Sequence, residues 1–141
     1  MAKKQIGKIL YPLIVSDIYG VILYDGKLND SYLGVLKNLS VERKIVCFSS
    51  MGQAQLDSLM KHENLSMISK FYSSASYDWS KHLMESYRLL ADEEKVSTSD
   101  IIFIDDSVQN VYAAKAAGCE ALLYDTTSSL MKNILDLGIE L

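Results

Sequence analysis

Residues 101–110 constrain the fold of this chain more than any other part of its sequence. Four consecutive apolar residues are typical of a buried parallel strand, and Ser107 before an alanine-rich stretch predicts a capped helix start. Two adjacent carboxylates, Asp105 and Asp106, lie between these elements, at the carboxyl edge of the sheet, where open α/β folds bind ligands. Neighbouring carboxylates repel each other unless a cation or hydrogen bonds offset the repulsion. The pair therefore predicts a metal site.

Alternating apolar runs and helical spacings indicate the fold class. Strands are expected at residues 13–15, 45–48, 101–104 and 121–124. Helices are expected after Asn29, from about residue 53, over 80–94, after the paired acids and over 130–137. This order predicts an α/β fold with a Rossmann-like parallel sheet and helices on both faces. The 141 residues are enough for one domain, 1–141.

An Asp-Gly pair follows the first expected strand. Asp25 and Gly26 lie between two short apolar pieces within residues 21–28, which is a strong signal for a β-hairpin. Projecting from the carboxyl end of the first strand, the hairpin would overhang any site at that edge.

Composition excludes several classes of function. The net charge of −4 disfavours binding to nucleic acid, because an acidic surface repels phosphate backbones. No apolar run is long enough to span a membrane, and no export signal follows the basic N-terminus. Cys47 and Cys119 lie in or beside apolar runs, as expected for buried thiols in a reducing compartment. We therefore expect a cytoplasmic protein.

Polar side chains end the other expected strands as well. Asp17 follows the first strand, and Ser49 and Ser50 follow the second. Parallel strands present their carboxyl ends at one edge, so these groups should converge with Asp105 and Asp106. Three carboxylates around one point require a divalent cation.

These segments together resemble the haloacid dehalogenase superfamily, whose members are mostly phosphatases. The resemblance extends from residue 13 to residue 124 and is carried by four motifs in the family's order: Asp17 to Val21, Ser49 after its apolar strand, Lys81 at the opening of a helix, and Asp105-Asp106 with Asn110 and Gly118.

The resemblance implies a magnesium-dependent phosphatase or phosphotransferase in which Asp17 attacks phosphorus and becomes an aspartyl phosphate. It assigns the metal to Asp17, the main-chain carbonyl of Tyr19 and a carboxylate of the fourth motif, and it leaves open whether Asp105 or Asp106 binds directly. Ser49 would hydrogen-bond the phosphoryl group, and Lys81 would neutralise its charge. The further residues expected to contact substrate are Tyr19, Ser50 and Asn110.

Some assignments have alternatives. Lys70 competes with Lys81, since lysines at helix starts are usually solvated and the family normally follows this lysine with proline, where this chain has His82. Asp106 or Ser107 could be only a helix N-cap, or could have that role in addition to binding metal. His62 and His82 have no partner at metal-ligand spacing and are expected on the surface.

Tyr19 is the main departure from the family pattern. Phosphatases of the family carry a second aspartate there, which protonates the leaving alkoxide and then activates water. A phenol, with an ordinary pKa near ~10, replaces it poorly at neutral pH. The change predicts slow hydrolysis, restriction to good leaving groups, or no turnover.

The superfamily's true dehalogenases also carry tyrosine at this position, because a halide leaves without a proton. However, they lack the paired acids and need a helical cap domain that supplies an arginine. Only 31 residues separate Asp17 from Ser49, and Arg43 precedes the second strand, away from the active edge. Dehalogenation is therefore the least favoured of the functional hypotheses.

The sequence thus predicts a capless phosphatase-like hydrolase whose activity is weakened by Tyr19. Its open site favours a phosphorylated substrate that is macromolecular, or a homo-oligomer in which a neighbouring chain supplies the lid. The alternative is a catalytically impaired protein that keeps the pocket to bind phosphate or to regulate.

Overall fold

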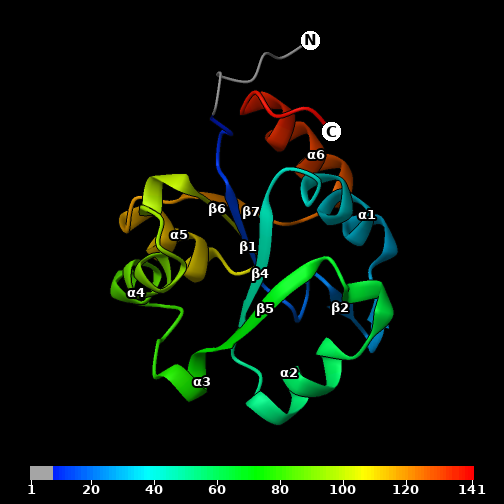
Figure 1. Cartoon of the computed structure of the whole chain (residues 1–141), viewed down its shortest axis with the longest axis vertical. Coiled ribbons are helices and arrows are strands. Elements are labelled where there is room, and N and C mark those ends of the chain that lie inside the picture. Colours follow the sequence, from blue (N-terminus) through cyan, green and yellow to red (C-terminus); the bar gives the residue numbers. More distant parts are fainter. Residues whose placement is uncertain (1–7) are drawn as a thin grey trace.

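Five parallel strands form a central sheet in a computed structural model that describes residues 8–141 (Figure 1). The strand order is β5-β4-β1-β6-β7, so β1, the first strand in sequence, is central. The bounds are β1 (Leu13–Ser16), β4 (Lys44–Ser49), β5 (Ile68–Ser73), β6 (Ile101–Asp105) and β7 (Glu120–Leu123). The order changes direction beside β1, which places the carboxyl ends of β1 and β6 next to each other at the position where ligands bind in such sheets.

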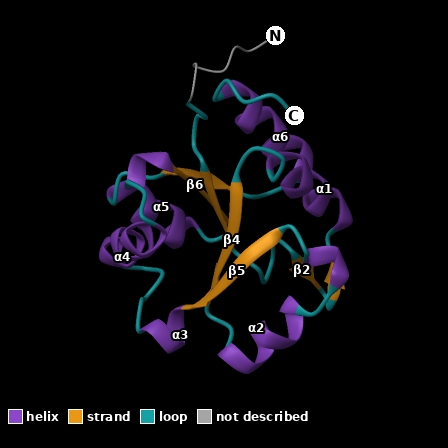
Figure 2. Ribbon diagram, viewed as in Figure 1, coloured by secondary structure: helices purple, strands orange, loops and turns teal. Residues whose placement is uncertain are grey.

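Helices cover both faces of this sheet (Figures 1 and 2). One face packs against α1 (Asp30–Leu39), α2 (Gln53–Met60) and α6 (Thr127–Asp136), and the other packs against α4 (Met84–Glu94) and α5 (Val108–Ala116). Alternate residues of β1 serve the two cores: Ile14 lies in the first, and Leu13 and Val15 lie in the second. The predicted α/β class and parallel sheet are confirmed.

A two-stranded hairpin follows β1, as the Asp-Gly pair predicted. β2 (Leu23–Tyr24) pairs antiparallel with β3 (Lys27–Leu28). The two turn residues have positive φ, 50° at Asp25 and 74° at Gly26, which is what a two-residue turn between twisted strands requires. Between β1 and β4, a stretch that the structure describes throughout, only this hairpin and α1 occur, so no cap domain is inserted there.

The predicted elements differ from the structure in three places. The edge strand β5 was not predicted; it is followed by the short helix α3 (Ser74–Tyr77). The helix expected over 80–94 begins only at Met84, because residues 80–83 form a turn that leads into it. The helix expected over 130–137 begins earlier, at Thr127, where the Thr126 side chain accepts a hydrogen bond from the Ser129 amide.

Two short 3-10 helices, η1 (Glu63–Leu65) and η2 (Thr98–Asp100), complete the elements of residues 8–141. Within that range no helix combines the length and the apolar character needed to cross a membrane.

Candidate active site

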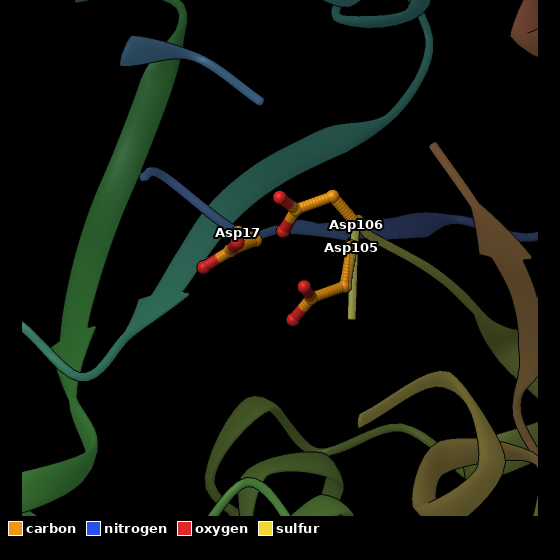
Figure 3. A group of neighbouring side chains, drawn as sticks. All are labelled: Asp17, Asp105 and Asp106. Atoms are coloured by element: carbon orange, nitrogen blue, oxygen red, sulfur yellow. The ribbon is translucent and has the colours of Figure 1, made fainter. Parts of the chain in front are cut away.

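Three carboxylates gather at the carboxyl edge of the sheet (Figure 3). Asp17 directly follows β1, Asp105 ends β6, and Asp106 is the next residue. One oxygen of each lies within 4.8 Å of the others. The parallel register of β1 and β6 brings them together, because it pairs Ser16 with Ile104 and lets the Asp17 amide donate to the Ile104 carbonyl at 2.9 Å.

Lys81 joins two of these carboxylates. Its Nζ lies 2.6 Å from Oδ1 of Asp17 and 3.0 Å from Oδ2 of Asp105. The side chain is 7% exposed, and the ammonium lies 5.7 Å and 5.9 Å from the ring centroids of Phe48 and Phe103. A cation so deeply buried must be paired, and the two carboxylates provide that pairing.

Asp105 is fixed on both of its oxygens. The Ser107 amide donates to Oδ1 at 2.9 Å, and the Asn110 side chain donates to Oδ2 at 3.0 Å, the oxygen that Lys81 also contacts. Burial by itself raises the pKa of Asp105, but the charge of Lys81 and these hydrogen bonds outweigh burial, so the pKa lies below its ordinary value. The same contacts that favour the ionised form of Asp105 also hold its carboxylate in position.

The other two carboxylates are less completely stabilised. Burial raises the pKa of Asp17 to about 7, with a smaller rise from the charge of Asp105 and an opposing effect of Lys81. Burial and the neighbouring Asp105 also raise the pKa of Asp106. Three carboxylates thus face a single ammonium among the described residues at the site. A divalent cation would offset the remaining negative charge, and hard carboxylate oxygens are the ligands that magnesium prefers.

Gly20 allows Asp106 to approach. A Cβ at residue 20 would lie 2.2 Å from Oδ2 of Asp106, and the φ of +92° is unfavourable for any residue with a side chain. The Gly20 amide donates to the Leu23 carbonyl at 2.7 Å, which ties the loop after Asp17 to the hairpin. The hairpin therefore helps to set the position of this loop.

A cavity of about 440 Å³ opens over the carboxylates. Of the residues expected to contact substrate, Tyr19, Ser50 and Asn110 line it, together with Lys81. The Tyr19 side chain is 67% exposed. Ser49 is buried behind the cavity instead, and its Oγ accepts a hydrogen bond from the Met51 amide at 3.1 Å.

The structure distinguishes between the two lysines. Lys70 lies on β5 with its Nζ 4.6 Å from the centroid of the Tyr72 ring, and Lys81 contacts the carboxylates. Arg43 donates from Nε to the carbonyls of Leu10 and Tyr11, before β1 begins, and so lies at the opposite edge of the sheet.

Several residues of the site have no clear sequence signal. Asp78, Ser80 and His82 also line the cavity; His82 is exposed, as expected, but it lies beside the site. Tyr87 on α4 donates its hydroxyl hydrogen to the Lys81 carbonyl at 2.7 Å, and Tyr32 on α1 is hydrogen-bonded to Ser16 at 2.6 Å behind Asp17. A buried tyrosine at helical spacing predicts core packing, so only the folded chain reveals these two contacts.

The fold and the cluster define a class: a Rossmann-like α/β protein with an acidic site at the carboxyl edge of a parallel sheet. Comparison with solved structures shows that the chain has the haloacid dehalogenase fold, as its motifs predicted. No protein-family model and no curated protein matches the sequence.

Three solved structures illustrate the likeness. An uncharacterized protein from Corynebacterium glutamicum aligns with a TM-score of 0.75 and 22% identity over 91% of this chain and 95% of its own. A predicted HAD-like family hydrolase from Porphyromonas gingivalis aligns with a TM-score of 0.67 and 18% identity over 82% and 60%. A HAD family enzyme from Bacteroides thetaiotaomicron, solved in complex with magnesium and inorganic phosphate, aligns with a TM-score of 0.61 and 17% identity over 70% and 53%. At identities this low, the structural alignments establish a shared fold and nothing further.

Proposed function

We propose that this chain is a magnesium-dependent phosphatase or phosphotransferase that acts through an aspartyl phosphate on Asp17. The observation that supports it best is the contact of Lys81 with both Asp17 and Asp105, 2.6 Å and 3.0 Å away, beside a third carboxylate. A nucleophilic carboxylate, a buried cation and an acidic cluster then share one cavity, as phosphoryl transfer requires.

In this proposal magnesium is held by Asp17, Asp105, Asp106 and the main-chain carbonyl of Tyr19. The chemistry that the metal supplies is neutralisation of the phosphoryl charge and orientation of the phosphoryl oxygens. The donors are all hard oxygens, and the excess of carboxylates over ammonium groups fits a divalent cation. Structures of the same fold have been solved with magnesium, which supports the choice of ion.

Asp17 performs the covalent step. One of its carboxylate oxygens attacks phosphorus, the bond from phosphorus to the leaving oxygen breaks, and the electron pair departs with that oxygen. Water then attacks phosphorus, the bond from phosphorus to the Asp17 oxygen breaks, and inorganic phosphate leaves while Asp17 is regenerated as a carboxylate. The proton that the water loses and the proton that the leaving oxygen gains are exchanged with solvent. Lys81 holds the attacking carboxylate in place and stabilises the negative charge of the phosphoryl oxygens. Ser50 and Asn110, which line the cavity, are the further proposed contacts, and Ser49 supports the loop from behind.

Tyr19 limits the rate in this proposal, because a phenol is a much weaker acid than the carboxyl group it replaces and assists the departure of an alkoxide less. The same residue favours the second candidate function: a protein that binds phosphate and magnesium without turnover. The exposed position of the Tyr19 side chain at the cavity is the observation behind this alternative.

The substrate is proposed to be phosphorylated and large, or else to be enclosed by a second copy of the chain, because no cap covers the cavity in the described residues. We also propose a cytoplasmic location, since Cys47 and Cys119 are both buried free thiols.

Phosphate release from 4-nitrophenyl phosphate tests the proposed function. Release should require magnesium, stop with EDTA, and be lost in Asp17→Asn. Asp25→Asn is the matched control, because Asp25 is an exposed turn residue whose left-handed backbone asparagine accepts, and it should keep full activity. Activity that survives in Asp17→Asn contradicts the assignment of the nucleophile. Magnesium-dependent binding of phosphate without any release supports the second candidate.

A further inference from the structure

A second hollow adjoins the cavity on the side of α5. It has a volume of about 300 Å³ and is lined by Val108, Gln109, Tyr112, Ala113 and His82. His82 also lines the acidic cavity, so the two spaces share a wall. His82 therefore lies between the hollow and the cavity in which the phosphoryl group would be held.

Three of the five residues that line this hollow are apolar or aromatic: Val108, Tyr112 and Ala113. Val108 is 69% exposed and Tyr112 is 76% exposed, four residues apart on one face of α5. Single exposed apolar residues need no explanation. Val108 and Tyr112 differ in that both line one hollow, where they offer an apolar contact surface beside His82.

The chemistry at Asp17 independently restricts the leaving group. Without a carboxyl group at residue 19 to donate a proton, we expect the leaving oxygen to depart as an anion and to take its proton from solvent. An aryl oxygen does so far more readily than an alkyl oxygen, since a phenol has a pKa near ~10 and an alkanol is about as weak an acid as water, near ~16.

We propose that the substrate is an aryl phosphate monoester whose ring lies in the hollow formed by His82 and α5 while its phosphoryl group faces Asp17 and Lys81. This inference rests on the proposed function. The reaction is balanced by departure of the phenolate with the electron pair of the broken bond from phosphorus to oxygen. The ring would pack against Val108 and Tyr112, which at present face solvent.

The first test measures binding without turnover. Phenylphosphonate and methylphosphonate carry the same charged group and differ in the ring, so calorimetry with magnesium present compares them directly. Wild-type protein should bind phenylphosphonate about tenfold more tightly, and Tyr112→Ala should reduce that ratio to near one. Leu135→Ala is the control, because Leu135 is an exposed apolar residue near the C-terminal end of α6, on the other face of the sheet. It should leave the ratio of the two affinities unchanged. Equal affinities, or no binding of either compound, overturn the proposal.

The second test uses turnover. kcat/KM should fall steeply across a series of phosphate esters as the leaving group becomes more basic, and the ratio of phenyl phosphate to acetyl phosphate should drop roughly tenfold in Tyr112→Ala. A series with no dependence on the basicity of the leaving group overturns the restriction to aryl esters.

These outcomes separate the two proposals. Asp17-dependent hydrolysis that treats alkyl and aryl esters alike supports the proposed function and overturns the aryl preference. A Tyr112-dependent preference for phenylphosphonate with no turnover supports the ring site and contradicts catalysis.

Discussion

The Lys81 ammonium lies 2.6 Å from a carboxylate oxygen of Asp17, although the two residues are 64 positions apart in sequence. Lys81 precedes α4, on one face of the sheet, and Asp17 follows the central strand. The contact therefore depends on how the segment before α4 is placed, and Tyr87 contributes to that placement through its hydrogen bond to the Lys81 carbonyl.

Replacing Lys81 tests whether this contact supports both folding and chemistry. Lys81→Met leaves Asp17 and Asp105 without their shared cation, so the free energy of unfolding in the absence of magnesium should fall by about 3 kcal/mol. Magnesium-dependent phosphate release should fall by at least about 100-fold. Urea unfolding and the phosphatase assay measure the two effects. Lys70→Met removes the same charge away from the carboxylates and should change neither quantity by much. Equal effects of the two substitutions would contradict the assignment of Lys81.

Magnesium affinity should depend on pH through Asp17. The metal binds the ionised carboxylate, and burial raises the pKa of Asp17 to about 7. The ionised fraction therefore rises about tenfold between pH 6 and pH 8, and affinity should rise by a similar factor. Calorimetric titration at both pH values measures it. An affinity that is the same at pH 6 and pH 8 would show that Asp17 is not a ligand.

Without metal, the same shift should make stability fall as pH rises. A carboxyl whose folded pKa lies above its unfolded value of 3.8 stabilises the fold below that value, and the contribution is lost as pH increases through about 7. Asp105 acts in the opposite sense and in a separate window, because its lowered pKa gives stability that is lost only as pH falls below 3.8. Thermal unfolding in EDTA between pH 5 and pH 8 should show the fall, and magnesium should reduce it.

Gly20 and Gly26 form a matched pair for testing the approach of Asp106. Both have positive φ, so alanine at either position should cost about 1–2 kcal/mol through the backbone. A methyl group at residue 20 would also collide with Asp106, whereas nothing lies within 4 Å of the equivalent atom at residue 26. Gly20→Ala should therefore also weaken magnesium binding, measured by calorimetry, and Gly26→Ala should not. Equal magnesium affinity in both variants would exclude a role for Asp106 at the metal.

Tyr19→Asp tests whether the missing acid is what limits turnover. A carboxyl group there should raise the rate for alkyl phosphates by roughly 100-fold or more, the usual contribution of general acid–base catalysis. Tyr24→Asp is the control, because Tyr24 is equally exposed on the hairpin, at 66% against 67%. Phosphate release from an alkyl ester measures the gain. A rate that stays at background in both variants favours the protein that binds phosphate without turnover.

Strong local signals predicted most of the fold. Unbroken apolar runs marked β1, β4 and β6, and an Asp-Gly pair marked the hairpin. β5 escaped prediction because an edge strand is only partly buried: Ser69 and Lys70 interrupt its apolar residues, and neither alternation nor a continuous run remains. The sheet order could not be read from sequence, since pairing depends on tertiary contacts.

Residues that follow strands were the predictable part of the candidate site. The carboxyl edge gathers Asp17, Asp105 and Asp106 whatever the details of packing. The position of Lys81 depends on the turn before α4. The sequence alone therefore could not decide whether Lys81 or Lys70 is the lysine of the site. His82 was correctly expected to be exposed. Its position between the acidic cavity and the hollow beside α5 could not be predicted, because it depends on how the turn before α4 packs.

The hairpin after β1 offers a route to engineering. Its tip at Asp25 and Gly26 faces open space, and exposed loop tips tolerate inserted sequence well. Its base is bridged to Tyr19, which lines the cavity. A folded module grafted at the tip would thus be tethered a few residues from the candidate active site. A library of such modules could be screened for control of access to the cavity without altering a residue of the sheet.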